Sequence, residues 1–213
     1  MKTTTLLLVR HGETAWNAEH RIQGHLDIPL STTGIQQAAR LAEHLATEPI
    51  EAIYSSELVR ARLTAEPVSA RSGVAITVES RLRERSFGIF EGLTLDEIAA
   101  RHPEGFHRWR ERDPEWAIEG GESGRQLIDR VLEALHDIVE RHRGGTILAV
   151  THGGVLDVVY RAARGLAWDA PREHQMLNAS VNRLRAATPP LSLAIVEWGD
   201  TAHLTRARDE SLT

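Results

Sequence analysis

Short apolar runs alternate along this chain with longer segments in which apolar residues recur at helical spacing. The runs at residues 6–9, 50–54, 74–78 and 146–150 are short enough for buried strands. The intervening segments have the period expected of helices that cover a sheet. The pattern therefore predicts an α/β fold in which strands and helices follow one another.

A first helix is predicted to begin in residues 31–34, where Ser and Thr precede a helical pattern. Its apolar positions are Ile35, Ala38, Ala42 and Leu45. We expect this face of the helix to lie on the sheet and Pro49 to end it. A second helix is predicted from residue 55, directly after the strand at 50–54.

Two pairs of residues have the spacing of a capping box, in which a Ser or Thr and a Glu or Gln satisfy the first N–H groups of a helix. Thr94 with Glu97 predicts a short helix that reaches Arg101, and Ser123 with Gln126 predicts a long one that ends near residue 142. Further predicted elements are a helix at 155–163, strands at 177–184 and 191–198 with a turn at 188–190, and a frayed tail from residue 205.

Residues 102–124 are predicted to be irregular, and they are rich in Pro, Gly, Trp, Arg and acidic side chains. Such long irregular segments are usually functional or disordered, and the tryptophans favour order. We expect one domain over residues 1–213, with an inserted lid at about 86–125. The alternative is a plain surface loop. The lid side chains expected to set substrate choice are His107, Trp109, Arg110 and Trp116.

Composition narrows the classes of function. The 213 residues are 41% hydrophobic and 26% charged with a net charge of -5, which argues against a nucleic-acid or anionic-membrane binder. The chain has no cysteine, so disulfides, thiolate metal sites and a cysteine nucleophile are excluded. No apolar run is long enough to span a bilayer, and no signal peptide is found at the start. We therefore expect a cytoplasmic protein.

The candidate chemistry lies where two predicted strands end. Arg10, His11 and Gly12 stop the first apolar run, and Thr151, His152 and Gly153 stop the run at 146–150 in the same way. Ligands of open α/β sheets collect beyond the carboxyl ends of the strands, and Gly12 would let a ligand approach the backbone. The alternative is an ordinary strand end with a chance basic pair.

Two further residues could join such a site. Arg60 lies near a predicted helix start, where free N–H groups and the helix dipole favour an anion; a solvated arginine is the alternative. Glu84 stands between two arginines and ahead of glycine-spaced aromatic residues. Shielding from water would favour the neutral form that a general acid needs, whereas the arginines favour the charged form. The sequence leaves that conflict open.

Two imidazoles with Arg10 and Arg60 suit a phosphoryl group, because guanidinium binds phosphate oxygens and neutral imidazole can attack phosphorus. The chain contains no HExxH motif and no GxxxxGK[ST] loop, and residues 121–125 fail the GxSxG pattern at the last position. The eleven histidines leave a metal site as an open alternative.

Taken together, these motifs resemble the histidine phosphatase superfamily, also called the phosphoglycerate mutase-like family. The resemblance runs from the first strand to about Arg183. It rests on these ordered stretches: residues 10–14 with Trp16 and Asn17, residues 21–24, residues 55–61, Glu84 in its Leu-Arg-Glu-Arg setting, and residues 151–153. The fold that the resemblance implies is a three-layer α/β/α sandwich with a mixed, mostly parallel sheet.

The resemblance also implies a mechanism through a phosphohistidine on His11 that needs no metal and no cofactor. Arg10, Arg60 and His152 would complete the phosphate pocket, and Glu84 would protonate the leaving oxygen and then activate water. The further residues expected to contact substrate are Asn17, Gln23, Gly24 and Gly153.

The family contains phosphatases and mutases. Residues 119–123 look more like those of the small broad-specificity phosphatases, and the mutases have a longer segment between the acid and the second histidine. We therefore expect a phosphomonoesterase that acts on a small phosphorylated metabolite. The alternatives are a phosphoglycerate mutase and a non-catalytic phosphate-binding protein. The oligomeric state stays open, with a homodimer among the options.

Overall fold

The computed structural model describes residues 2–209 and has one six-stranded sheet at its centre. The strands lie in the order β3-β2-β4-β1-β5-β6. The first three pairings of that order are parallel, and β5 runs antiparallel to both β1 and β6. The sheet is therefore mixed and mostly parallel, as the resemblance implies.

The elements follow one another along the chain in the alternation that the apolar pattern predicts. The strands are β1 (Thr4–Arg10), β2 (Ile50–Ser55), β3 (Ile76–Val78), β4 (Thr146–Thr151), β5 (Val181–Ala187) and β6 (Ser192–Asp200). The α-helices are α1 (Ala15–Ala18), α2 (Thr32–His44), α3 (Val59–Ser72), α4 (Leu95–Arg101), α5 (Pro103–Arg110), α6 (Gly124–Arg141) and α7 (Gly153–Arg164). Short 3-10 turns lie at Ser80–Leu82 and Gly88–Phe90.

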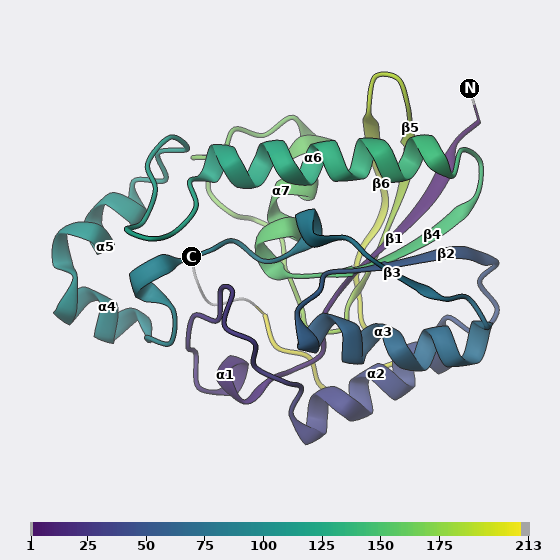
Figure 1. The fold of residues 1–213 in the computed structure, drawn as a ribbon, viewed down its shortest axis with the longest axis horizontal. Helices are drawn as coiled ribbons and strands as arrows, with labels where there is room; N and C mark the ends of the chain where they lie inside the picture. The colour runs from purple at the N-terminus through teal and green to yellow at the C-terminus, as the bar shows by residue number, and fades with distance from the viewer. Residues whose placement is uncertain (1, 210–213) are drawn as a thin grey trace.

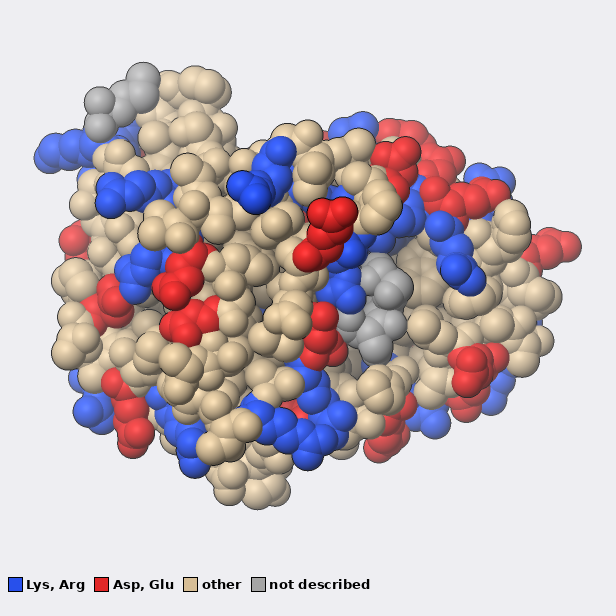
Figure 2. Space-filling model, turned by 180° about the vertical axis from the view of Figure 1, so that it is seen from behind, with Lys and Arg blue, Asp and Glu red and all other residues tan. Residues whose placement is uncertain are grey.

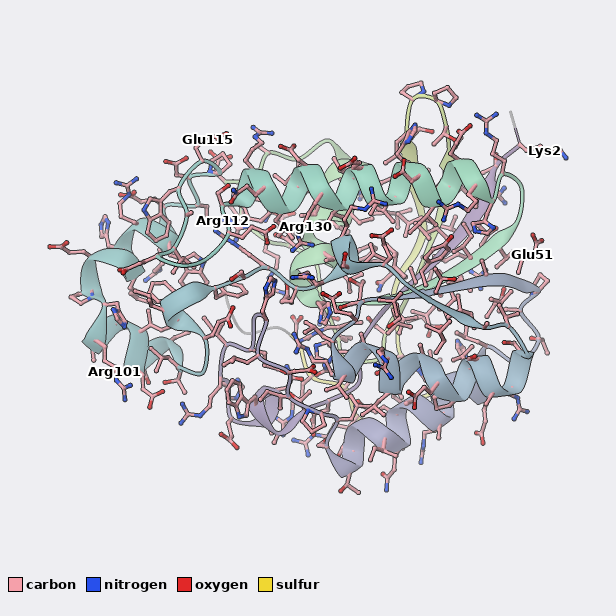
Figure 3. All side chains as sticks on the ribbon, viewed as in Figure 1. Lys2, Glu51, Arg101, Arg112, Glu115 and Arg130 are labelled. Atoms are coloured by element: carbon pink, nitrogen blue, oxygen red, sulfur yellow. The ribbon has the colours of Figure 1, made fainter. Side chains whose placement is uncertain are left out.

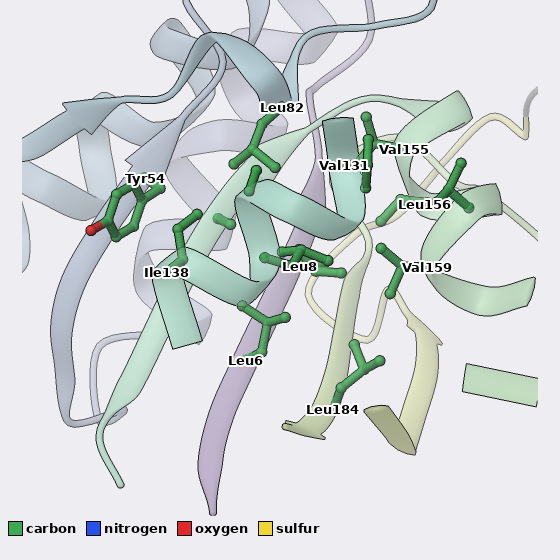
Figure 4. Close-up of a cluster of buried hydrophobic side chains, with 14 of the residues drawn as sticks. Leu6, Leu8, Tyr54, Leu82, Val131, Ile138, Val155, Leu156, Val159 and Leu184 are labelled. Atoms are coloured by element: carbon green, nitrogen blue, oxygen red, sulfur yellow. The ribbon is translucent and has the colours of Figure 1, made fainter. Parts of the chain in front are cut away.

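Helices cover both faces of the sheet, so the fold has three layers (Figure 1). Successive side chains of a strand point to opposite faces. Leu6 and Leu8 of β1 accordingly pack with residues of α6 and α7 (Figure 4). Leu7 and Val9 pack with residues of α2 and α3. Because both faces are buried, β1 is apolar throughout its middle, which explains the continuous run in the sequence.

The 86–125 segment lies to one side of this sandwich and carries α4 and α5 (Figure 1). It has its own apolar cluster, in which Phe87, Phe90, Ile98 and Ile118 are buried together with Ile22. Trp109 packs edge-on against Phe87 and Phe90. The prediction of irregular structure over 102–124 is wrong for residues 103–110, because Pro103 stands in the first turn of α5, where a missing N–H costs nothing.

Several sequence predictions agree with the structure in detail. Ser31 is the N-cap of α2, and both predicted capping boxes are present at the starts of α4 and α6. Apart from these caps, the prediction that Ile35 faces the sheet is wrong, since 59% of its surface is exposed. Gln37 is buried instead, because its side-chain oxygen accepts from the backbone N–H of Glu13 at 2.8 Å.

Element boundaries and the tail differ from prediction. The strand β2 runs through Ser55 and α3 begins at Val59, later than the predicted residue 55. The late strands β5 and β6 form the predicted hairpin, with β5 beginning at Val181 instead of 177. The tail was expected to fray, yet over residues 205–209 it is held: Arg208 Nε donates to Glu13 at 2.6 Å. Residues 210–213 lie outside the described residues.

On the face drawn in Figure 2, positive and negative side chains are interspersed rather than gathered by sign. Within residues 2–209, no helix is both long and apolar enough to cross a membrane.

Candidate active site

The two His-Gly motifs meet because β1 and β4 are parallel neighbours. Their register pairs Arg10 with Thr151, so His11 and His152 are the first residues beyond the two strand ends. The backbone N–H of His11 donates to the carbonyl of Thr151 at 2.9 Å. The imidazole ring centroids lie 5.2 Å apart. The sheet therefore delivers both rings to one crevice, as the repeated pattern predicts.

The tautomer of His11 is set by its own loop. Its Nδ1 lies 2.7 Å from the carbonyl oxygen of Gly12, which can only accept, so Nδ1 carries the hydrogen. The Nε2 atom consequently has a lone pair. Burial lowers the pKa of His11 well below its usual value, and the charges of Arg60 and Arg10 lower it further. The ring is therefore neutral near pH 7 and suited to act as a nucleophile.

His152 is held by a hydroxyl group. Its Nε2 lies 2.9 Å from Oγ of Ser56, while its Nδ1 is buried with no hydrogen-bond partner among residues 2–209. The side chain is completely buried, and that burial, followed by the charge of Arg60, lowers the pKa of His152. A neutral ring with one unmatched nitrogen can donate to or accept from a ligand atom in the crevice.

Arg10 and Arg60 are both fully buried and are oriented by backbone carbonyls. Arg10 Nη1 donates to the carbonyl of Met176. Arg60 donates to the carbonyls of Gly24 and Leu26 at 2.7 and 2.8 Å. These carbonyls fix the position of both guanidinium groups beside His11, and the charges of Arg60 and Arg10 lower the pKa of that histidine.

Glu84 is the carboxylate of this crevice, and 6% of its surface is exposed. Its Oε1 accepts from the backbone N–H of Gly154 at 3.1 Å and from that of Arg85 at 2.7 Å. Gly154 lies in the first turn of α7, directly after the second His-Gly motif. Glu84 is therefore hydrogen-bonded to the N-terminal turn of α7, the helix that begins directly after His152.

The backbone around Glu84 is fixed by one arginine from α6. This arginine is Arg130, which is labelled in Figure 3. It donates to the carbonyls of Arg81, Arg83 and Glu84 at 2.6, 2.9 and 2.9 Å. The guanidinium is itself paired with the carboxylate of Glu122 at 2.6 Å. Sequence reasoning did not single out Arg130, because its carbonyl partners are 46 or more residues away along the chain.

The remaining predicted contact residues lie on the loops around the crevice. The side-chain oxygen of Asn17 accepts from the backbone N–H of Thr14 at 3.0 Å, which makes it part of the cap of α1. Gln23 is 7% exposed, and its Oε1 has no hydrogen-bond partner among residues 2–209. Gly24 holds Arg60 through its carbonyl, and Gly153 is the first residue of α7.

One expectation about glycine is corrected by the structure. Gly12 was expected to admit a ligand to the backbone. A Cβ built on Gly12 would lie 2.8 Å from the carbonyl oxygen of Gly34, so the close approach is that of the first turn of α2. The glycine is needed for packing of the loop that carries His11 against that helix.

Other residues around the crevice were missed or misassigned. Asn178 donates to the carbonyl of His11 at 3.0 Å, and the Thr64 hydroxyl accepts from the backbone N–H of Gly12 at 2.9 Å. Ser56 was assigned only to a helix start. Asn178, Thr64 and Ser56 are all small polar residues that are completely buried. Their burial depends on tertiary packing and could not be predicted from the local sequence.

A cavity of about 360 Å³ opens beside Glu84 and Gly154. The 86–125 segment forms much of its wall, through Phe87, Trp109, Arg110, Arg112, Asp113 and Trp116. Of the four predicted lid residues, His107 is not among the residues that line it. Among residues 2–209, no group of three or more His, Cys, Asp or Glu side chains is arranged to hold a metal ion.

Comparison with known proteins gives one family. The model of the histidine phosphatase superfamily (branch 1) matches residues 6–201. The chain is 41% identical to phosphoglycerate mutase-like protein 4 of Arabidopsis thaliana over 202 residues, which cover 93% of this chain and 86% of the relative.

Two further similarities concern function and fold. A metal-independent phosphoserine phosphatase of Arabidopsis thaliana is 38% identical over 208 residues, covering 96% of this chain and 84% of the relative. The solved structure of Bacillus stearothermophilus YhfR superimposes with a TM-score of 0.84 at 37% identity, covering 94% of this chain and 98% of that one.

Proposed function

The chain belongs to the histidine phosphatase superfamily and is a phosphoric monoester hydrolase, and we propose that His11, Arg10, Arg60, Glu84 and His152 carry its reaction. The observation that carries this assignment is the state of His11: a neutral imidazole, with Nδ1 donating to Gly12 and a lone pair on Nε2, beside the charges of Arg60 and Arg10. The substrate is a small phosphorylated metabolite, and the reaction needs no metal.

In the first step, Nε2 of His11 attacks the phosphorus atom of the monoester. A nitrogen–phosphorus bond forms while the bond from phosphorus to the ester oxygen breaks. The leaving oxygen takes a proton from the carboxyl group of Glu84 and departs as an alcohol. The products of this step are a phosphohistidine and an ionised Glu84.

In the second step, a water molecule attacks the phosphorus atom of the phosphohistidine. Glu84 accepts a proton from this water, and the nitrogen–phosphorus bond breaks with its electron pair returning to Nε2. Inorganic phosphate leaves, and both residues regain their starting protonation states. One carboxyl group thus serves as acid and then as base.

Negative charge on the transferring phosphoryl group is met by Arg10 and Arg60, whose backbone carbonyl partners hold them in place. His152 can donate from Nδ1 if Ser56 donates its hydroxyl hydrogen to Nε2; the same oxygen then accepts from the N–H of Leu58 at 3.3 Å. We assign Asn17, Gln23, Gly24 and Gly153 to the surrounding substrate-binding loops, with Gly24 acting through Arg60.

We also propose that residues 1–213 work as one domain in which the 86–125 segment is a lid over the site. Its own apolar cluster supports this, because the segment can keep its shape while moving against the sandwich. A cysteine-free chain suits the cytoplasm as the proposed location. For the oligomeric state we propose a homodimer. Size-exclusion chromatography with light-scattering detection, which gives the molar mass of the eluting protein, tests this.

The test of the proposed function is phosphate release from p-nitrophenyl phosphate in the presence of a chelator, with wild type beside His11→Ala. Wild type should turn over and should form an acid-labile, base-stable phosphoenzyme. His11→Ala should do neither. Turnover by His11→Ala at the wild-type rate would remove His11 from its role.

A mutase is the second candidate, because a relative carries a mutase-like name. Incubation with 3-phosphoglycerate and 2,3-bisphosphoglycerate distinguishes the two. A phosphatase releases inorganic phosphate, whereas rapid isomerisation without release would show a mutase. A protein that only binds phosphate would give neither result on a broad panel of substrates.

A further inference from the structure

Ala179, two residues before β5 begins, holds the backbone of His11 on the side of β1 that faces away from β4. Its N–H donates to the carbonyls of Arg10 at 3.0 Å and of His11 at 3.3 Å. The side-chain amide of Asn178 donates to the same His11 carbonyl at 3.0 Å. Since the N–H of His11 donates to Thr151 of β4, the backbone of His11 is held from both sides.

Ala179 makes these contacts in a backbone conformation that alanine avoids. Its φ is +54°, in the left-handed region, where the Cβ of any residue other than glycine comes too close to the backbone. Its side chain is also completely buried. Such a conformation persists only where the surrounding structure imposes it, so it depends on the hydrogen bonds of the N–H and carbonyl groups of Ala179.

The carbonyl of Ala179 is bound by His203, in the turn that follows β6. Nε2 of His203 lies 3.1 Å from that carbonyl oxygen, which can only accept, so Nε2 carries the hydrogen and donates it. Nδ1 of His203 is buried and has no hydrogen-bond partner among residues 2–209. Burial, followed by the charge of His44, lowers the pKa of His203. His203 is therefore a neutral donor near pH 7.

The ring of His203 is held in place by α2 and by the end of β6. It stacks on the ring of His44, with the centroids 4.6 Å apart and the planes inclined by 20°. Nε2 of His44 lies 2.9 Å from Oδ2 of Asp200, and Oδ1 of Asp200 accepts from the N–H of Ala202 at 2.9 Å. One carboxylate thus fixes the turn that carries His203 and the ring on which His203 stacks.

We propose that His203 is a positioning residue for the nucleophile. By donating to the carbonyl of Ala179 it keeps Ala179 in the left-handed conformation, and Ala179 in turn fixes the backbone of His11. His203 acts through Ala179 and not on the substrate. This inference rests on the proposed function, because that proposal makes His11 the nucleophile.

Two substitutions of His203 separate its hydrogen bond from its ring. His203→Phe keeps an aromatic ring against His44 and loses the donor, whereas His203→Gln loses the ring and offers a side-chain N–H in place of Nε2–H. The measurement is nitrophenolate release in a single turnover of p-nitrophenyl phosphate, which reports attack by His11. We expect this step to be roughly 10- to 100-fold slower in His203→Phe, because misplacement of a reacting group by about 1 Å can cost about 100-fold. His203→Gln should recover most of the wild-type rate.

Ala179→Gly tests the same connection at the backbone. Glycine adopts a positive φ without the steric penalty of alanine, so Ala179→Gly added to His203→Phe should restore part of the lost rate. His136→Phe is the matched control, because it makes the same substitution at a partly exposed histidine of α6, and it should keep the wild-type rate. A wild-type rate in His203→Phe, a larger loss in His203→Gln than in His203→Phe, or no restoration by Ala179→Gly would overturn the proposal.

NMR of protein that carries ¹⁵N-labelled histidine separates this inference from the proposed function, because no turnover is required. The Nδ1–H signal of His11, assigned by its absence from His11→Ala, should be sharp and similar in wild type and His203→Gln. It should shift or broaden in His203→Phe, because the backbone of His11 is no longer fixed. Hydrolysis by wild type with the same His11 signal in all three proteins would overturn the inference alone. The expected change of the signal without any hydrolysis would support the positioning of His11 while the proposed function fails.

Discussion

The backbone N–H of Gly154 donates to the carboxylate of Glu84 at 3.1 Å, across 70 residues of sequence. This hydrogen bond connects the acid to the start of α7, and α7 begins where the second His-Gly motif ends. The position of Glu84 relative to His152 is therefore set by a helix terminus, a rigid element with free N–H groups.

Replacement of Gly154 by Ala should displace the acid. A Cβ at residue 154 would lie 2.4 Å from Oε1 of Glu84, and the carboxylate end can move away at little cost to folding. We expect kcat for phosphomonoesters to fall by about 10-fold or more, in the range of partial loss of general acid–base catalysis. Urea unfolding should show near wild-type stability. A wild-type kcat would contradict the role of this contact.

Glu84→Gln should slow hydrolysis by roughly 10²- to 10⁴-fold, the usual contribution of general acid–base catalysis. The loss should be larger for glycerol 3-phosphate than for p-nitrophenyl phosphate, because nitrophenolate leaves without a proton. Measured kcat/KM values for both substrates check this, because kcat/KM reports the first step, in which the leaving oxygen is protonated, and not the later hydrolysis of the phosphohistidine that both substrates share. An equal loss would show that Glu84 does not protonate the leaving oxygen, and an unchanged rate would place the acid elsewhere.

Ser56→Ala should affect His152 without changing the charge of the site. The hydroxyl lies 2.9 Å from Nε2 of His152 and is fully buried, so its removal leaves that nitrogen unmatched and frees the ring to change tautomer. We expect kcat/KM to fall by about 10-fold, corresponding to one hydrogen bond of ~1–2 kcal/mol. Ser56→Thr keeps the hydroxyl and is the control. If Ser56→Ala and Ser56→Thr had the same kcat/KM, the hydroxyl of Ser56 would have no role in holding His152.

The two buried histidines should make stability fall in mild acid. Burial lowers the pKa of His11 and of His152, so below about pH 6.5 the unfolded chain binds protons that the folded protein does not. Stability from this source is complete above pH 6.5 and is lost as pH falls, by up to about 1.4 kcal/mol per pH unit for each histidine.

Urea unfolding between pH 7.5 and 5.0 measures this loss. The window lies above the titration of ordinary carboxyl groups. His11→Asn should unfold with a weaker dependence on pH across the window, because one of the two histidines is removed. The same slope in wild type and variant would show that His11 is not held neutral in the folded protein.

The local sequence was sufficient to predict the order of strands and helices in the fold. Strand and helix periods are set by backbone geometry, so the apolar run of β1 and both capping boxes could be identified from residues close together in the chain. The repeated His-Gly ending predicted two imidazoles in one crevice, and the β1–β4 pairing confirms it. The exposed Ile35 and the helix at 103–110 were misjudged, because tertiary packing overrides the local pattern at both positions.

The partners of the site residues were decided by tertiary structure alone. The hydrogen bond of Ser56 to His152 and the carbonyls held by Arg130 join segments that lie far apart in the chain. No local period encodes such contacts. By itself, the sequence determined the reactive groups and the strand ends that carry them. Folding determined their tautomers and their burial, because these depend on which distant side chains and carbonyls surround each group.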